Sequence, residues 1–335
     1  MLILFSLLLM LFQQATPLVL PHDDIVTSAQ WDVTETRLLT TSEDGTIRLW
    51  DARTGEAIWQ VNQQSAVRGA VWDQARILAW TKGGEIVVLD AQTGSELQQL
   101  SLDGMISGAR WISEDEILVW YGQQVVSLTL DGETLFSAVH QTRVLQAMPS
   151  DRHILTYELG GLAHIWDAQT GEELRQLRFN EETLGVAWRD DESGLISWGG
   201  DGAAVIWSIE DGQQLVIRSL DHTRTFVSGA AWNADQTRVV SWGADETARL
   251  WDADTGELLF SARHTDWVTG AALNKTEDKL LTWSFNTAYV WDIENRTLIF
   301  SVSHDNLVSG AVFNQDETQL LTWSWDGTAR VWTVP

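Results

Sequence analysis

The sequence predicts an all-β fold, an eight-bladed β-propeller whose blades are four-stranded antiparallel sheets. Three observations predict it: a unit close to forty residues long recurs eight times, each unit contains short strand-like runs separated by turn residues, and the two ends of the chain complete one unit between them. The third strand of each unit ends at Trp50, Leu89, Leu128, Trp166, Trp207, Trp251, Trp291 and Trp332. These spacings lie between 38 and 44 residues, which favours a repeat architecture over separate globular domains.

The last complete unit, residues 304–332, shows the elements that we expect in each repeat. β-Branched and aromatic residues are concentrated in three runs and predict strands at 308–313, 320–324 and 328–332. Asn, Asp and Gly separate these runs and predict turns at 314–317 and 325–327. In the other units a fourth strand is expected after a turn such as Asp51–Gly55.

The first strand of most units has small residues, often Gly-Ala, at its centre. We predict these strands at 26–31, 67–72, 106–111, 144–149, 183–188, 227–232, 268–273 and 308–313. Small residues weaken an isolated strand. We expect them here because neighbouring backbones crowd together around a central axis.

The two ends of the chain are expected to close the ring. Only three residues follow Trp332, so the last unit lacks its fourth strand, while Pro17–Leu20 is a strand-like run that belongs to no unit. Pairing of 18–20 with 328–332 would complete the last blade. Residues 16–335 are therefore expected to form one propeller domain.

The chain begins with an apolar run, Met1–Phe12, that is too short to span a bilayer as a helix. It is similar to the apolar region of a secretory signal, with Ala15 as the expected cleavage point. We therefore predict a signal peptide at residues 1–15 and an exported protein that is periplasmic, on the cell surface or extracellular. The alternative is a membrane anchor formed by residues 1–12.

Composition excludes several kinds of site and partner. The net charge of −26 disfavours nucleic acid, because affinity for phosphates comes largely from Lys and Arg. It also disfavours anionic lipid surfaces, so no membrane insertion of the mature chain is expected. The absence of Cys excludes disulfides, thiolate zinc sites and cysteine nucleophiles. The simplest interpretation of the charge is solubility.

Four residues recur at fixed places in the unit: His before the first strand, Ser or Thr on the second, Asp in the next turn and Trp on the third strand. The set is complete as His22, Thr40, Asp44 and Trp50, as His222, Ser241, Asp245 and Trp251, and as His304, Thr322, Asp326 and Trp332. At these residues the chain resembles the WD40-repeat family, and the resemblance covers residues 17–335. It implies a buried hydrogen-bonded network in each blade and a top face that binds proteins or peptides.

Other units keep only part of the set. Asn286 stands in the Asp place beside His264, Thr282 and Trp291; Gly160 does so beside His140, Thr156 and Trp166; and Asn180 takes the His place beside Ser197, Asp201 and Trp207. The second and third units have lost the set and are assigned from spacing and first-strand pattern. A His/Ser/Asp trio also suits nucleophilic catalysis, but its recurrence in several units favours a structural network.

A second set of large aromatic residues follows the network Ser or Thr on the second strand. Its members are Trp80, Trp120, Tyr157, Trp198, Trp242, Trp283 and Trp323, with Thr41 as the exception. Because side chains alternate along a strand, these rings point to the opposite face of the blade. We predict packing between blades, and stacking on a sugar or another ligand is the alternative.

The two ends of the predicted ring differ in composition. The turns after the first and third strands hold 31 of the 47 Asp and Glu residues, which predicts a strongly negative bottom end. Whether this end collects divalent cations is left open. The turns before the first strand and after the second form the top.

An apolar cluster is predicted on the top of the last three units, where a partner could bind. Its residues are Phe226, Trp267, Phe285, Leu307 and Trp325, with Glu43, Asp266, Asp305 and Asn306 at its rim. Large aromatics are unusual in tight turns, and exposed apolar patches mark interaction sites. The alternative is that these rings fold down onto the blades.

Three functions are compatible with this pattern. The first is a monomeric, non-catalytic scaffold with no cofactor or metal, which binds an unidentified protein or peptide through its top face. The second is a structural module of an envelope assembly. The third is a quinone-cofactor enzyme, because turns such as Asp51–Glu56 and Asp167–Glu172 resemble those of eight-bladed quinone-dependent dehydrogenases. Such enzymes need long inserts, and the units here differ in length by only a few residues.

Overall fold

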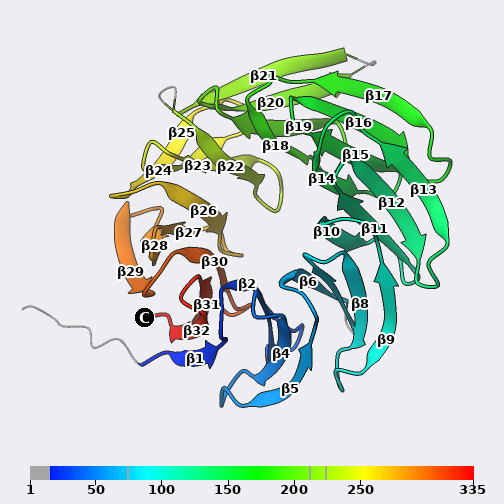
Figure 1. Cartoon of the computed structure of the whole chain (residues 1–335). Helices are drawn as coiled ribbons and strands as arrows, with labels where there is room; N and C mark the ends of the chain where they lie inside the picture. Colours follow the sequence, from blue (N-terminus) through cyan, green and yellow to red (C-terminus); the bar gives the residue numbers. More distant parts are fainter. Residues whose placement is uncertain (1–15, 74, 211–212, 223–224) are drawn as a thin grey trace, which may run out of the picture.

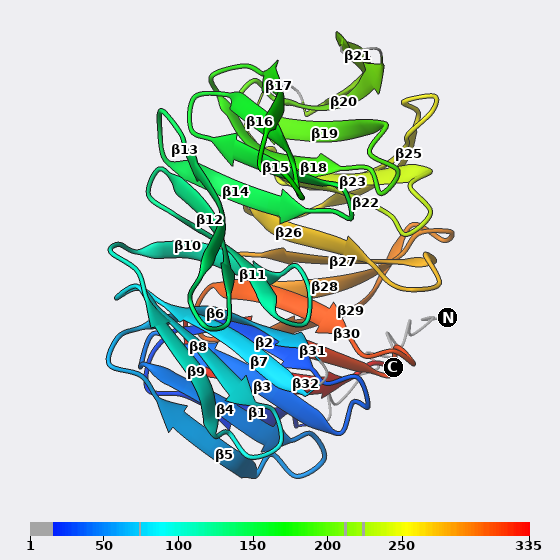
Figure 2. The ribbon, with the colours of Figure 1, turned by 90° about the vertical axis from the view of Figure 1, so that its right-hand side faces the viewer.

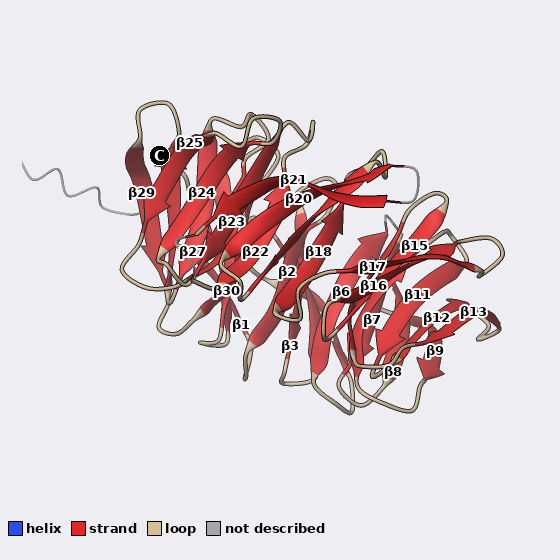
Figure 3. Ribbon diagram, turned by 90° about the horizontal axis from the view of Figure 1, so that it is seen from above, coloured by secondary structure: helices blue, strands red, loops and turns tan. Residues whose placement is uncertain are grey.

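A computed structural model of the chain describes residues 16–73, 75–210, 213–222 and 225–335. The predicted signal peptide, residues 1–15, lies outside the described residues. In the described part of the chain the secondary structure consists of strands and loops (Figure 3). Among these residues, no helix has the length and apolarity needed to cross a lipid bilayer.

Eight four-stranded antiparallel sheets are arranged in a ring around a central axis (Figure 1). We number the blades 1 to 8 in chain order and name the four strands of each blade inner, second, third and outer. The inner strands are β2 (Val26–Trp31), β6 (Val67–Asp73), β10 (Ile106–Trp111), β14 (Val144–Pro149), β18 (Thr183–Trp188), β22 (Val227–Trp232), β26 (Val268–Leu273) and β30 (Val308–Phe313). The second strands are β3 (Arg37–Ser42), β7 (Arg76–Thr81), β11 (Glu116–Tyr121), β15 (His153–Glu158), β19 (Gly194–Gly199), β23 (Arg238–Gly243), β27 (Lys279–Ser284) and β31 (Gln319–Ser324).

The third and outer strands complete the sheets. The third strands are β4 (Thr46–Asp51), β8 (Glu85–Asp90), β12 (Gln124–Thr129), β16 (Leu162–Asp167), β20 (Ala203–Glu210), β24 (Thr247–Asp252), β28 (Thr287–Asp292) and β32 (Thr328–Thr333). The outer strands are β5 (Ala57–Asn62), β9 (Glu96–Ser101), β13 (Thr134–Val139), β17 (Glu173–Arg178), β21 (Gln213–Asp221), β25 (Leu258–Arg263), β29 (Thr297–Ser303) and β1 (Leu18–Pro21). The predicted fold class is confirmed, including blades 2 and 3, which lack the recurring polar set.

The first strand of the chain closes the ring. β1 pairs with β32 in antiparallel register, with Leu18 opposite Val331 and Leu20 opposite Ala329. Figures 1 and 2 both place β1 beside β32, next to the C-terminus. The predicted pairing of the two chain ends is therefore confirmed. β1 serves as the outer strand of blade 8, whose sheet order is β1-β32-β31-β30.

The hydrophobic core is divided among the seams between blades. Leu20, Leu321 and Val331 of blade 8, for example, pack with Val26 and Leu38 of blade 1. The predicted aromatic set takes part in these seams: its members contact apolar residues of the following blade, as Trp283 does with residues of blade 8. The expected packing between blades is therefore confirmed. Each blade is stable only against its neighbours, because one sheet alone cannot bury both of its faces.

The glycines of the inner strands have a different cause from the one we expected. At Gly69, Gly108, Gly185, Gly229, Gly270 and Gly310 an added Cβ would collide with the Trp ring of the neighbouring second strand, and at Gly270 it would lie 1.9 Å from Cζ2 of Trp283. The ring therefore lies across the glycine within one blade. Blade 1 lacks both partners, because Ser28 faces Thr41 there through a 2.7 Å hydrogen bond between their hydroxyls.

Replacing Gly270 with Ser should lower the free energy of unfolding by about 1–3 kcal/mol, because the new side chain displaces the Trp283 ring. The double variant Gly270→Ser/Trp283→Thr copies blade 1 and should be more stable than the sum of the two single effects predicts. Urea denaturation followed by tryptophan fluorescence measures both. Thr269→Ala, an exposed change on the same strand, is the control. Simple additivity would contradict the assigned contact.

Candidate interaction surface

The top end of the ring is organised by three complete hydrogen-bond networks. In blade 1, His22 Nε2 lies 2.7 Å from Thr40 Oγ1, and His22 Nδ1 lies 3.1 Å from Asp44 Oδ2. The Trp50 indole N–H donates to the same Thr40 oxygen at 2.7 Å. Because a carboxylate only accepts, Nδ1 carries the proton of the neutral ring, and the Thr40 hydroxyl donates to Nε2.

The same contacts recur in blades 6 and 8. They join His222, Ser241, Asp245 and Trp251, and His304, Thr322, Asp326 and Trp332. The three predicted sets are thus confirmed as networks within their blades. Each network ties the segment before the inner strand to the turn after the second strand, and so it fixes the two loops that form the top of its blade.

An arginine completes each of these networks and was missed in the sequence analysis. In blade 8, Arg330 Nε donates to Thr328 Oγ1 at 3.0 Å, and Nη2 donates to Asp326 at 2.9 Å. Arg48 and Arg249 make the same contacts in blades 1 and 6. The sequence contains a pattern that could have revealed them, since each of these arginines lies two positions after the threonine that begins the third strand.

Hydrogen bonds keep the network carboxylates ionised in spite of their burial. Burial alone would raise the pKa of Asp44, but hydrogen bonds from Thr46 and from the Asp23 backbone N–H outweigh it and lower the pKa to about 2. Burial likewise opposes the hydrogen bonds from His222 and Thr247, which lower the pKa of Asp245 to about 2. For His22, burial outweighs the attraction of Asp44 and lowers the pKa to about 4. The histidine is therefore neutral at pH 7.

In blades 4 and 7, both the Asp and the Arg of the complete network are replaced by other residues. Blade 7 has Asn286 in the Asp place and Tyr289 in the Arg place, and the Tyr289 ring meets the His264 ring edge-on at a centroid distance of 4.9 Å. Blade 4 has Gly160 and His164 in these places. Among the described residues, Nδ1 of His264 and Nδ1 of His140 have no hydrogen-bond partner. These two networks therefore lack the contact between His and Asp.

The neutral His264 makes stability depend on pH. Burial lowers its pKa from 6.5 to about 4. The imidazole of His264 binds a proton at a higher pH in the unfolded chain than in the folded chain. The stabilisation contributed by the neutral ring is therefore complete above pH 6.5 and is lost as the pH falls toward 4. The loss from this residue is on the order of 2–3 kcal/mol. Urea denaturation at several pH values between 7 and 4 tests this. The free energy of unfolding should fall less steeply with decreasing pH in His264→Gln than in the wild type, and an equally steep fall would contradict the assignment.

Four large aromatic residues are exposed at the top of three consecutive blades. Trp267 is 58% exposed, Phe285 52%, Trp325 49% and Phe226 38%. Leu307, the fifth predicted residue, is half-buried. The rings therefore do not fold down onto the blades. Phe226 belongs to blade 6, Trp267 and Phe285 to blade 7, and Leu307 and Trp325 to blade 8.

Hydrogen bonds to backbone carbonyls link the segments that carry these residues. The Ser284 hydroxyl donates to the Asp266 carbonyl next to Trp267 at 3.0 Å. Across the seam to blade 8, the Val308 N–H donates to the Phe285 carbonyl at 2.8 Å. Within blade 8, the Trp325 N–H donates to the Leu307 carbonyl at 2.9 Å. We call Trp267, Phe285, Leu307 and Trp325 the top cluster. Phe226 lies one blade away, where its carbonyl accepts from the Ala244 N–H.

Two of the predicted rim carboxylates, Asp305 and Glu43, differ in their surroundings. Asp305 has a 93% exposed side chain and only a 3.4 Å contact with Arg330. Glu43 instead forms a 2.8 Å ion pair with Arg68 of blade 2. The Asp305 carboxylate, close to Leu307 and Trp325, is therefore largely exposed to solvent. The Glu43 carboxylate is instead paired with a residue of blade 2.

Phe285 has a backbone conformation that is rare for an aromatic residue. Its φ is +50°, in the left-handed region. Blade 3 has the same two-residue turn, with Gly122 at φ +52° in the corresponding place. In both turns the carbonyl of this residue accepts from the first residue of the following inner strand, Val144 or Val308. The same turn geometry is thus adopted by glycine in blade 3, which accommodates a positive φ easily, and by the bulky, exposed Phe285 in blade 7.

The bottom end holds many carboxylates, and many of them bond to their own surroundings. The antiparallel strand order places the turns after the inner and third strands at this one end. Asp51 accepts the N–H groups of Arg53 and Thr54, and Asp90, Asp167 and Asp252 cap their turns in the same way. Glu317 reaches from blade 8 to Asn274 of blade 7 at 2.7 Å. Within the described ranges no group of three His, Asp or Glu side chains could hold a metal ion.

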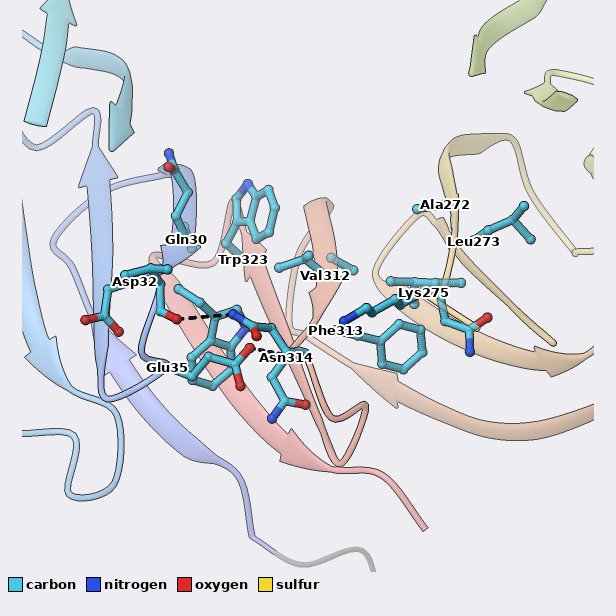
Figure 4. Close-up of a pocket in the computed structure, with 17 residues that line it drawn as sticks. Gln30, Asp32, Glu35, Ala272, Leu273, Lys275, Val312, Phe313, Asn314 and Trp323 are labelled. Carbon is cyan, nitrogen blue, oxygen red and sulfur yellow. Dashed lines mark hydrogen bonds between the residues drawn. The ribbon is translucent and has the colours of Figure 1, made fainter. Parts of the chain in front are cut away.

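A cavity of about 730 Å³ lies at the bottom of blades 7, 8 and 1 and was not predicted (Figure 4). The ends of three inner strands contribute to its lining, with Gln30, Ala272 and Val312 among the residues. Figure 4 shows these side chains on separate strands around one open space. The sequence could not reveal it, because the cavity depends on how side chains of three separate blades pack around it.

Two family models match parts of the chain. The model "WD domain, G-beta repeat" matches residues 16–51, 214–252 and 295–333. A second model, described as outer membrane protein assembly factor BamB, matches residues 43–177. The WD matches fall on the blades with complete networks. The BamB match covers the turns at Asp51, Asp90 and Asp167. A search of the curated proteins found no match.

Solved propellers share the fold at low sequence identity. The computationally designed Ika8 protein has a TM-score of 0.82 at 23% identity, covering 94% of this chain and 98% of its own. Sqt1 of Saccharomyces cerevisiae has a TM-score of 0.80 at 13% identity, with 94% and 97% covered. The C-terminal WD40 domain of Sif2 has a TM-score of 0.78 at 16% identity, with 96% and 98% covered. The repeat matches, the networks and the eight closed blades together show that the chain is an eight-bladed β-propeller with WD40 repeats in blades 1, 6 and 8.

Proposed function

We propose that this propeller is a non-catalytic scaffold that binds a protein or peptide through the top cluster, with Phe226 and Asp305 at the edge of the contact surface. The conformation of Phe285 carries the proposal. A non-glycine residue in the left-handed region costs about 1–2 kcal/mol, and Gly122 meets the same need in blade 3 without that cost. Folding alone therefore does not require an aromatic residue here. Exposed aromatics of this kind supply much of the binding energy in protein interfaces.

Replacing Phe285 with Gly separates binding from folding. The free energy of unfolding should stay the same or rise by up to ~1 kcal/mol, because the strain is released and only backbone entropy opposes the gain. Partner capture by cross-linking should fall by roughly 30-fold or more, the usual effect of truncating a central interface residue. Trp325→Ala should act in the same direction.

Leu159→Gly is the matched control for this experiment. Leu159 is 50% exposed at the top of blade 4, away from the top cluster. Its replacement should leave partner capture unchanged. Equal losses for Phe285→Gly and Leu159→Gly, or unfolding of Phe285→Gly, would contradict the proposal.

A second candidate function is a module of an envelope assembly, which the match to the BamB model favours. Export is part of this proposal. β1 runs from the bottom to the top, and Thr16 lies at the bottom beside Glu35 and Asp51. An uncleaved anchor at 1–12 would hold the acidic end against anionic lipid head groups, which would repel it. Cleavage after Ala15 avoids this repulsion. N-terminal sequencing of the exported protein should begin at Thr16, and a chain that begins at Met1 would support the anchor.

A further inference from the structure

The top of blades 7, 8 and 1 carries carboxylates without cations of its own. Its loops are residues 264–268, 284–287, 303–308, 324–328, 22–26 and 42–46, all within the described part of the chain. They contain seven Asp or Glu residues and no Lys or Arg. Their histidines, His22, His264 and His304, are buried. The surface around the top cluster is therefore negative at neutral pH.

Three arginines of blades 1, 2 and 8 pair with carboxylates of these loops. Arg48 and Arg330 bind the buried network carboxylates Asp44 and Asp326 at 3.2 and 2.9 Å. Arg68 pairs with Glu43 at 2.8 Å. These contacts pair three of the seven carboxylates with an arginine.

Four carboxylates remain exposed around the aromatic rings: Asp23, Asp24, Asp266 and Asp305. Asp266 directly precedes Trp267, and Asp305 lies two residues before Leu307. Blade 1 adds Asp23 and Asp24 because the His22 N–H donates to the Gly327 carbonyl at 2.7 Å, which holds this segment beside the Trp325 turn. In the described residues, only Asp305 of these four has an ion pair, the 3.4 Å contact with Arg330.

We infer that the partner segment is a peptide with apolar side chains between Lys or Arg residues. Its apolar side chains would contact Trp267, Phe285 and Trp325. Its cations would lie among the four exposed carboxylates or over the faces of the indole rings, which attract cations. The net charge of −26 would speed the encounter with such a segment. This inference rests on the proposed function, because it assigns a chemistry to the partner of the same surface.

Fluorescence polarisation of labelled peptides tests the inference with the purified chain. The probe is a peptide of three Lys-Lys-Leu-Phe repeats. Two matched peptides carry Glu for Lys or Ser for Leu and Phe. We expect the first peptide alone to bind, with an affinity that falls as salt rises, and we expect binding to be lost in Trp325→Ala. The double variant Asp266→Asn/Asp305→Asn should weaken binding about tenfold.

The control variant Asp115→Asn/Asp131→Asn makes the same change in net charge at exposed positions of the bottom end. It should leave the affinity unchanged. Equal weakening by both double variants would mean general attraction to an acidic protein and would overturn the inference. Binding of the Glu peptide in a manner that depends on Trp325 would overturn the inference and leave the proposed function standing. Binding of the Lys peptide that ignores Trp325 would overturn both.

Discussion

Replacing Leu20 with Asp should unfold the propeller at temperatures where the wild type is stable. Leu20 is fully buried and packs with Val26 and Leu38 of blade 1 and with Leu321 of blade 8. Truncation of such a side chain to Ala costs about 2–5 kcal/mol, and a carboxylate without a partner at this position costs more. The effect should exceed that of a typical core substitution, because Leu20 belongs to the strand that joins the two ends of the ring.

Val19→Asp is the matched control for ring closure. Val19 is the neighbouring residue of β1 and is 43% exposed, since alternate side chains of a strand point to opposite faces. This change should alter the free energy of unfolding by less than about 1 kcal/mol. Thermal and urea denaturation measure both variants. A wild-type midpoint for Leu20→Asp would contradict closure of the ring by β1.

Replacing Asp326 with Ala should destabilise the protein by about 3–5 kcal/mol, because it leaves two partners without their acceptor inside the blade. His304 Nδ1 lies 2.9 Å from this carboxylate, and Arg330 Nη2 also lies 2.9 Å from it. Although burial opposes ionisation, the hydrogen bonds from His304 and Thr328 lower the pKa of Asp326 below its usual range. The contribution is therefore present above pH 4 and is lost as the pH falls below that value.

The neighbouring acid provides the comparison for Asp326. Asp305→Ala removes the same charge from the same blade, but its side chain is 93% exposed. Its effect on stability should be within about 0.5 kcal/mol. Urea denaturation at pH 7 should separate the two variants clearly. Equal effects would show that the network contributes through net charge rather than through its hydrogen bonds.

Repetition made most of the fold predictable. A period close to forty residues, with strand and turn residues in fixed order, leaves few architectures. The four residues of each complete network could also be assigned, because they recur at the same places in three units. Blades 2 and 3 could be placed from spacing alone, since a blade must fill the angle between its neighbours in a closed ring.

Contacts between residues far apart in the sequence were harder to predict. The inner-strand glycines have a clear pattern, but its cause, the Trp ring of the neighbouring strand, depends on cross-strand register. Arg330 was missed although its spacing recurs, because its role depends on where the guanidinium turns. The ion pair between Glu43 and Arg68 of the next blade was not predicted, because the two residues lie 25 positions apart in the sequence.

The sequence alone determined the number of blades, their four strands, the residues of the polar networks and the joining of the chain ends. All of these follow from a local pattern repeated at a fixed interval. Only the tertiary structure decided that the rings of Trp267, Phe285 and Trp325 stand exposed, that Phe285 takes a conformation used by glycine elsewhere, and that a cavity opens beneath blades 7, 8 and 1. These features depend on how neighbouring blades pack against one another, and no single repeat contains that information.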